Sequence, residues 1–282
     1  MKNINFNLYR YQILPKDRYF QGNLFGDILT VDDLIAKKND LFYQQIQTLV
    51  QWKGKKISLK GQLEYDQDNF LLFRFAPKRT TKIENENFQE EQYEDWPSIL
   101  VGIWNDPQKQ IIAIQDRKKA FPDTKTPLKT IVQSINSVLE IKQLKVYAEP
   151  IFHKEAFWSI IEQYDRKIKN IKFELITPNM ANISGALSED LKSLAKGTNT
   201  AKTLLEIDAD GDSVLHIDQQ NKQVSSIVDY ASEGGGNISV KVKGITKRVH
   251  TANAVKSIEI GELEVTSDNL ESIVQILRRA LQ

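Results

Sequence analysis

The chain has 282 residues, and its 38 basic and 37 acidic side chains leave a formal net charge of +1. This balance excludes a protein whose whole surface is basic, so any contact with a polyanion has to come from a local patch. The absence of cysteine excludes disulfides, thiolate metal sites and cysteine nucleophiles. No segment approaches the roughly 20 apolar residues of a membrane span, and the N-terminus lacks the apolar stretch of a signal peptide. We therefore expect a soluble, cytoplasmic protein without membrane insertion.

The first half of the chain alternates strand and helix signals. Residues Thr30-Val31-Asp32-Asp33 resemble a capping box with Asp in place of Glu, and they predict a helix start. The long polar segment 81–95 is expected to be an exposed loop. In chain order, the periodicity predicts a strand at 3–14, helical structure over 31–50, a hairpin of 57–63 and 70–75, a second hairpin of 98–104 and 110–114, and a helix over 126–139.

The second half again mixes strands and helices. The segment Asp208-Ala209-Asp210-Gly211-Asp212 lies between two alternating stretches and predicts a tight hairpin turn. The expected elements are a strand at 145–152, a helix at 154–164, a strand at 168–176, a helix from Ser188 to Gly197, strands at 203–207 and 213–217, a helix at 220–231, a strand after Gly234–Gly236, a strand or strand pair over 258–265, and a closing helix capped by Ser267-Asp268.

Hairpins and short links between strands favour antiparallel sheets over a doubly wound parallel sheet. The sequence therefore predicts an α+β fold of mostly antiparallel sheets with packed helices, divided into two subdomains. We place the boundary near Gln143. This gives an N-terminal α+β domain at 1–143 and a C-terminal α+β domain at 144–282 that holds the glycine-rich basic strand.

The segment from Gly234 to Gly244 carries the strongest functional signal. Three consecutive glycines precede a strand in which Lys241 and Lys243 share one face, since strand side chains alternate. A helix stop explains one of these glycines but not three. Flexible backbone beside a row of lysines suits contact with phosphates, which lysines and backbone amides bind without reading bases.

The predicted phosphate contacts form two sets. One surrounds the glycine-led strand, and the other immediately precedes and enters the strand at 168–176. Other basic clusters, such as the lysines between 53 and 60, are interpreted as solvated surface. The first set comprises Gly235, Gly236, Lys241, Lys243, Lys247 and Arg248, and the second comprises Arg166, Lys167 and Lys169.

No sequence motif of an enzyme active site has the spacing that its chemistry needs. Asp208, Asp210 and Asp212 begin like a calcium loop, but the glycine stands at the fourth position and position twelve is Gln219. The three histidines lie far apart, and neither a Walker loop nor a nucleophile elbow is found. We therefore predict no catalytic residue, no metal and no cofactor. Carboxylates that converge only in the fold keep a metal-dependent nuclease open as the alternative.

Two short phrases resemble the RexA-like DNA-binding proteins of phage exclusion. Trp96-Pro97-Ser98-Ile99-Leu100-Val101 is similar to the Pro-Ser-hydrophobic strand opening of that family, and Val146-Tyr147-Ala148-Glu149-Pro150-Ile151 is similar to its Val-x-x-Glu-Pro-hydrophobic strand. The order of elements and the total length are also similar, whereas the Gly-Gly-Gly-Asn segment has no counterpart there. The resemblance implies a cytoplasmic homodimer that binds double-stranded DNA without sequence specificity.

We accordingly expect a bacterial or prophage antiphage-defence protein that binds nucleic acid through backbone phosphates, with DNA favoured over RNA. A homodimer and a second defence subunit as partner belong to this expectation. The alternatives are the nuclease effector named above and a protein-interaction subunit of a defence complex. In the last case the lysine strand would be a sheet edge protected against aggregation.

Overall fold

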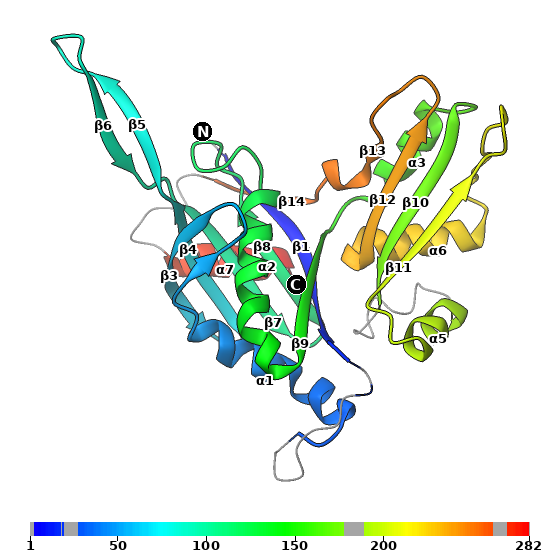
Figure 1. Ribbon diagram of the computed structural model, residues 1–282, viewed down its shortest axis with the longest axis horizontal. Coiled ribbons are helices and arrows are strands. Elements are labelled where there is room, and N and C mark those ends of the chain that lie inside the picture. Colours follow the sequence, from blue (N-terminus) through cyan, green and yellow to red (C-terminus); the bar gives the residue numbers. More distant parts are fainter. Residues whose placement is uncertain (1–2, 18, 20–27, 178–188, 262–269, 282) are drawn as a thin grey trace.

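The computed structural model describes residues 3–17, 19, 28–177, 189–261 and 270–281. Within these residues the chain forms two antiparallel sheets with packed α-helices and a separate two-stranded hairpin (Figure 1). The predicted α+β fold with mostly antiparallel sheets is therefore confirmed. The expected helix start at Ser188 and the expected cap at Ser267-Asp268 lie outside the described residues. No helix in the described part of the chain is both long enough and apolar enough to cross a bilayer.

The first sheet is built around the long strand β1 (Asn3–Pro15). One edge of β1 pairs with β8 (Lys109–Gln115), and the other edge pairs first with β14 (Ser257–Gly261) and then with β9 (Leu144–Pro150). The C-terminal part of the chain thus completes the sheet that the N-terminus begins. Beyond β8 the sheet continues through β7 (Ile99–Asp106), β4 (Phe70–Pro77), β3 (Ser58–Gln67) and β2 (Trp52–Lys53).

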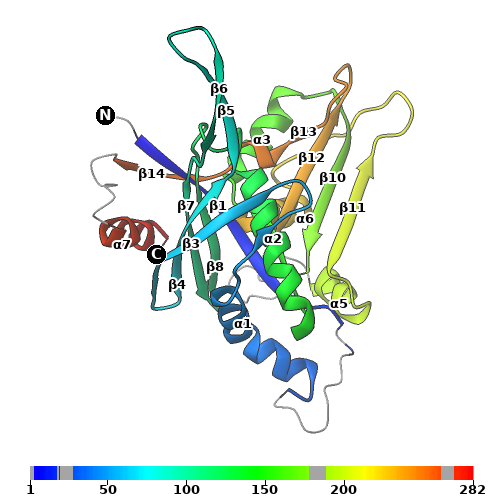
Figure 2. The ribbon, with the colours of Figure 1, turned by 60° about the vertical axis from the view of Figure 1, so that its left-hand side comes forward.

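Helices cover both faces of the first sheet. α1 (Val31–Gln47) and α2 (Lys125–Leu139) pack on one face, and α7 (Leu270–Leu281) packs on the other, as Figure 2 shows. The capping box predicted at the start of α1 is present, because Asp33 N donates to Thr30 Oγ1 at 3.2 Å and Thr30 N donates to Asp33 Oδ2 at 2.9 Å. Each sheet face therefore has its own apolar core.

The second sheet lies beside the first, next to the edge that β9 forms (Figure 1). Its helices cover only one face, where Phe157, Phe173 and Val228 are fully buried. The other face carries polar side chains. The strands follow in the order β11 (Lys202–Asp208), β10 (Ile168–Ile176), β12 (Gly236–Val242) and β13 (Val249–His250), and the helices are α3 (Lys154–Gln163), α5 (Glu189–Gly197) and α6 (Lys222–Tyr230).

The two sheets do not follow the boundary expected near Gln143. β9 begins directly after that residue, yet it pairs with β1 of the first sheet. β14 and α7 also return from the C-terminal part of the chain to the first sheet. One continuous segment therefore forms the second sheet and its helices. The residues before it and after it in the chain belong to the first sheet.

Two expected elements differ in the structure. The segment 81–95, expected to be a loop, lies in the hairpin of β5 (Arg79–Glu84) and β6 (Glu90–Asp95), in which Lys82 of one strand forms a diagonal ion pair at 2.5 Å with Glu90 of the other. The segment 213–217, expected to pair with 203–207, is not a strand. β11 pairs with β10 instead, a partner distant in sequence that local turn signals do not reveal.

A cluster of buried polar side chains joins α1 to the first sheet. Asn39 Nδ2 donates to Asn105 Oδ1 at 2.8 Å, and Asn105 Nδ2 donates back to the Asn39 carbonyl at 2.8 Å. The Tyr11 hydroxyl donates to Asn105 Oδ1 at 3.0 Å, and Gln110 Nε2 donates to Asn39 Oδ1 at 3.2 Å. All four residues are buried, and burial raises the pKa of Tyr11 well above its usual value. Removing one member therefore takes hydrogen-bond partners from its neighbours in a place that is shielded from water.

We expect Asn105→Ala to lower the free energy of unfolding by about 2–3 kcal/mol, because it removes the acceptor of the buried Asn39 amide and leaves the Tyr11 hydroxyl with the Trp104 carbonyl alone. Urea unfolding followed by circular dichroism measures this change. Gln92→Ala on the exposed strand β6 is the control and should change the free energy by less than about 0.5 kcal/mol. Equal effects of the two substitutions would contradict the role of the buried cluster.

Candidate functional site

The glycine run of the predicted binding segment joins the two sheets. Gly234 has a φ of 83°, in the left-handed region that favours glycine, and a Cβ atom there would overlap Arg10 of β1. Arg10 is buried, its Nε donates to the Glu233 carbonyl at 2.5 Å, and its guanidinium lies 3.5 Å from the Glu233 carboxylate. Burial lowers the pKa of Arg10, and Glu233 opposes that shift. These contacts fix the turn η2 (Ala231–Gly235) against the first sheet.

The next two glycines also lack side chains for steric reasons. A Cβ atom on Gly235 would overlap the Tyr230 ring, and one on Gly236 would overlap the carbonyl oxygen of Glu174 on β10. Both glycines are buried. Their backbone amides therefore lie inside the protein, and the predicted phosphate contacts from Gly235 and Gly236 do not belong to a surface site.

The structure brings the two predicted basic sets together at one end of the second sheet. Ile168 of β10 pairs with Val242 of β12, and the Lys243 amide donates to the Lys167 carbonyl at 2.7 Å. Two sets that are far apart in sequence therefore share one surface. Their exposed members, here called the sheet-end cluster, are Arg166, Lys167, Lys243 and Lys247.

The other three predicted cations bind groups of the protein itself. Lys241 Nζ donates to two carbonyls of the turn after β12, at 2.9 and 2.7 Å. Lys169 Nζ donates to two carbonyls of the turn after β11, at 2.9 and 2.5 Å. Arg248 donates from Nε to the Ser239 hydroxyl at 2.9 Å and from Nη2 to the Asn170 side chain. These three side chains therefore stabilise turns and the edge strand β13.

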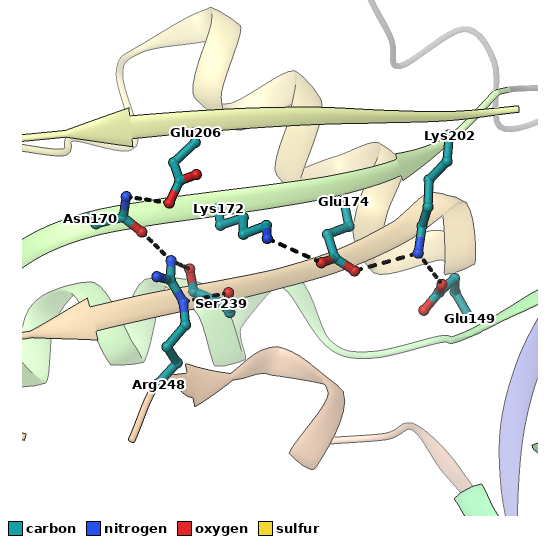
Figure 3. Close-up of polar contacts among 8 residues, drawn as sticks. All are labelled: Glu149, Asn170, Lys172, Glu174, Lys202, Glu206, Ser239 and Arg248. Atoms are coloured by element: carbon teal, nitrogen blue, oxygen red, sulfur yellow. Dashed lines mark hydrogen bonds and ion pairs between the residues drawn. The ribbon is translucent and has the colours of Figure 1, made fainter. Parts of the chain in front are cut away.

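The uncovered face of the second sheet carries a row of ion pairs (Figure 3). Glu174 lies 3.7 Å from Lys172 and 3.4 Å from Lys202, and Lys202 also lies 3.7 Å from Glu149 of β9. Burial raises the pKa of Glu149, and Lys202 opposes that shift. Cations and carboxylates alternate along this row, so it presents no excess of positive charge to a polyanion.

A groove runs along the outer side of α2 and was not predicted from the sequence. Four adjoining hollows of about 490, 280, 300 and 330 Å³ form it. Neighbouring hollows share wall residues: Gln133 belongs to the first three, and Lys125 and Leu128 line the last two. The hollows are therefore parts of one depression, which we call the α2 groove. It lies between the turn at 53–57 and β9, and it ends beside His250.

The α2 groove is strongly basic. Seven exposed lysines line it, against two carboxylates among the residues that line the four hollows. One of these carboxylates, Glu140, pairs with Lys16 at 2.7 Å, and the other is the largely buried Glu149. In a chain with a net charge of +1, this is a large local excess. The lysines are Lys16, Lys53, Lys55, Lys56, Lys125, Lys129 and Lys145.

Amide side chains of α2 hold both walls of the groove in place. Gln133 accepts a hydrogen bond from the Lys55 amide at 2.9 Å, which fixes the lysine-rich turn against the helix. Asn136 donates to the Val146 carbonyl at 2.9 Å and accepts from its amide at 2.6 Å, which fixes β9 on the other side. The lysines therefore project from a rigid frame, which lowers the entropic cost of binding a ligand.

Some of the lysines that line the groove can be recognised as a group from the sequence alone. The lysines between 53 and 60 form a basic cluster for which the sequence predicts a solvated surface, and three of them line the groove. Lys125 and Lys129 are one helical turn apart, so they lie on the same side of α2. Lys16 and Lys145 are isolated in the sequence, and only strand pairing brings them here.

The acidic segment at 208–212 does not gather a metal-binding cluster in the described residues. No group of three His, Asp or Glu side chains in that part of the chain could hold a metal ion. The Asp208 carboxylate accepts a hydrogen bond from Asn170 at 2.5 Å, and the Asp210 carbonyl accepts one from the Ser213 amide at 2.8 Å. The acidic segment therefore forms a tight turn. Burial lowers the pKa of His250 at the end of the α2 groove.

Comparisons of the chain with protein-family models, curated proteins and solved structures find no match. The sheet-end cluster and the α2 groove are two basic surfaces of the described part of the chain.

We expect Gly236→Ala to lower the free energy of unfolding by about 3 kcal/mol, because the added methyl group meets backbone that cannot move aside. Gly197→Ala at the end of α5 is the matched control, since a Cβ atom there has no neighbour within 4 Å. It should be neutral or slightly stabilising, because alanine favours helix more than glycine does. Thermal unfolding compares the two. A Gly236→Ala protein as stable as wild type would refute the steric requirement.

Proposed function

We propose that this protein binds nucleic acid, with double-stranded DNA favoured, through backbone phosphates and without sequence specificity. The observation that carries the proposal is the α2 groove, in which seven exposed lysines line one continuous depression. A lysine ammonium group binds phosphate as a point charge and does not read a base from there. Affinity would therefore depend on salt far more than on sequence.

The length of the groove suits contact with several phosphates. α2 has 15 residues, and a rise of about 1.5 Å per residue makes it about 22 Å long. Phosphates of one DNA strand rise about 3.4 Å each along the helix axis and complete a turn in about ten base pairs, so a straight groove of this length faces the few phosphates that lie on one side of the duplex.

The side chains that line the groove favour a duplex over a single strand. Proteins that bind single strands stack bases on exposed aromatic rings. Two tyrosines line the four hollows: Tyr9 is buried, and the ring of Tyr147 lies 5.3 Å from Lys145 Nζ. The lining residues therefore offer no row of rings on which successive bases could stack.

The sheet-end cluster is an auxiliary contact surface in this proposal. Its four cations are exposed, but acidic side chains lie at the same end of the sheet. Asp165 lies 3.6 Å from Arg166, and the turn after β11 exposes Asp210 and Asp212. The local excess of positive charge is therefore smaller than in the groove. Phage exclusion, taken from the RexA-like phrases, is the proposed setting for this binding.

We expect Lys55→Ala/Lys129→Ala to weaken binding to all duplex sequences alike. The slope of log affinity against log salt should fall by about two, because two phosphate contacts are lost. Fluorescence anisotropy with two unrelated duplexes over a salt series measures this. Lys60→Ala/Lys222→Ala removes the same charge outside the groove and should leave the slope nearly unchanged. Identical results for both pairs would refute the groove as the binding site.

We expect Lys167→Ala/Lys243→Ala to weaken duplex binding less than the groove pair does, with a decrease in the salt slope of about one at most. The reason is that neighbouring carboxylates already offset much of the positive charge at the sheet end. The same anisotropy series shows which of the two surfaces contributes more to the affinity for duplex DNA. A larger loss than that of Lys55→Ala/Lys129→Ala would make the sheet-end cluster the primary contact.

A further inference from the structure

The hairpin β5–β6 projects from the first sheet as an isolated arm (Figures 1 and 2). It forms a two-stranded sheet of its own, and its residues are exposed along nearly the whole length. Its base is fixed, since Arg79 donates to the Ala120 carbonyl at 2.5 Å and Asp95 lies 3.4 Å from Lys119. A two-stranded hairpin without packing partners is marginally stable in water. A surface that covers the arm would therefore stabilise it.

The arm has the opposite charge to the α2 groove. Between Arg79 and Asp95 the chain carries six carboxylates and two cations. Glu84 and Glu86 lie beside the turn at the tip and are exposed. Three of the six carboxylates pair with lysines, as Glu90–Lys82, Glu94–Lys78 and Asp95–Lys119, so the excess negative charge lies toward the tip, at Glu84, Glu86 and Glu91. This is charge of the kind that the lysines of the groove attract.

Large apolar side chains are also exposed on the arm. Phe88 at the tip is 87% exposed, Ile83 is 53% exposed and Tyr93 is 50% exposed. Ile83 pairs with Glu91, and Thr81 pairs with Tyr93, so Ile83 and Tyr93 lie on the same face of the hairpin. Apolar side chains gathered on a projecting charged element indicate a contact surface.

The α2 groove complements the arm in length and in chemistry. Each strand of the arm has six residues, and about 3.4 Å per residue makes it about 20 Å long, close to the length of α2. Besides its lysines, the groove is lined by the apolar side chains of Ile57, Leu128 and Val132. The arm points away from α2 of its own copy in both views (Figures 1 and 2). Its fitting partner is therefore a second molecule.

We propose that the acidic arm of one copy of this chain docks into the α2 groove of a second copy. The chain then associates with itself, and the arm occupies the lysines that would otherwise bind phosphates. Competition between the arm and nucleic acid rests on the proposed function, whereas the association itself does not. Because lysine–carboxylate contacts contribute to it, the association weakens as salt concentration rises.

Sedimentation velocity of the full chain at low and high salt, without nucleic acid, tests the association. Glu84→Lys/Glu86→Lys removes the excess negative charge of the arm, and Lys55→Glu/Lys129→Glu removes most of the excess positive charge of the groove. We expect wild type to associate at low salt and each variant alone to stay monomeric. An equimolar mixture of the two variants should associate again, because the unchanged arm of the groove variant then meets the unchanged groove of the arm variant. Monomeric wild type at every concentration, or variants that associate as wild type does, would overturn the proposal.

Phe88→Ser separates this inference from nucleic-acid binding, because the residue is almost fully exposed and lies outside the groove. We expect it to weaken the association severalfold and to bind duplex DNA more tightly than wild type at concentrations where wild type associates. Association that follows the expected pattern without any duplex binding supports the arm contact and refutes the proposed function. Duplex binding by a wild-type protein that is monomeric throughout supports the function and refutes the arm contact.

Discussion

The hydrogen bonding of β1 along both of its edges is the constraint on which the rest of the structure depends. β8 occupies one edge, while β14 and β9 share the other, so segments from the start, middle and end of the chain meet on one strand. Arg10 of the same strand reaches the turn that leads into β12. β1 therefore organises the first sheet and also fixes the place of the second. The α2 groove, bordered by β9, is a consequence of that arrangement.

Local signals in the sequence predicted most of the elements but not their partners. The capping box at Thr30, the helix at 126–139 and the hairpin of 98–104 and 110–114 rest on contacts between residues close in sequence, and all are present. The pairing of β14 with β1 and of β11 with β10 joins distant segments. Alternation of apolar residues shows that a strand exists but not which edge it completes.

The glycine run shows how one sequence signal admits two physical causes. Three glycines in a row exceed what a helix stop needs, and the excess was attributed to contact with phosphates. In the structure each glycine lacks a Cβ atom because Arg10, Tyr230 or Glu174 lies too close. A run of glycines looks the same in a sequence whether close packing or access of a ligand requires it. The positions of the distant partners Arg10 and Glu174 separate the two causes.

The near-zero net charge of the chain conceals a separation of charge in the fold. A balance of 38 basic and 37 acidic residues suggests a surface without preference for polyanions. In the fold, seven lysines from separate segments line one groove, while six carboxylates gather on one arm. Opposite charges held apart on one rigid molecule attract between molecules rather than within one. Low net charge further reduces the repulsion between copies, so the same composition that argues against a general polyanion binder favours self-association.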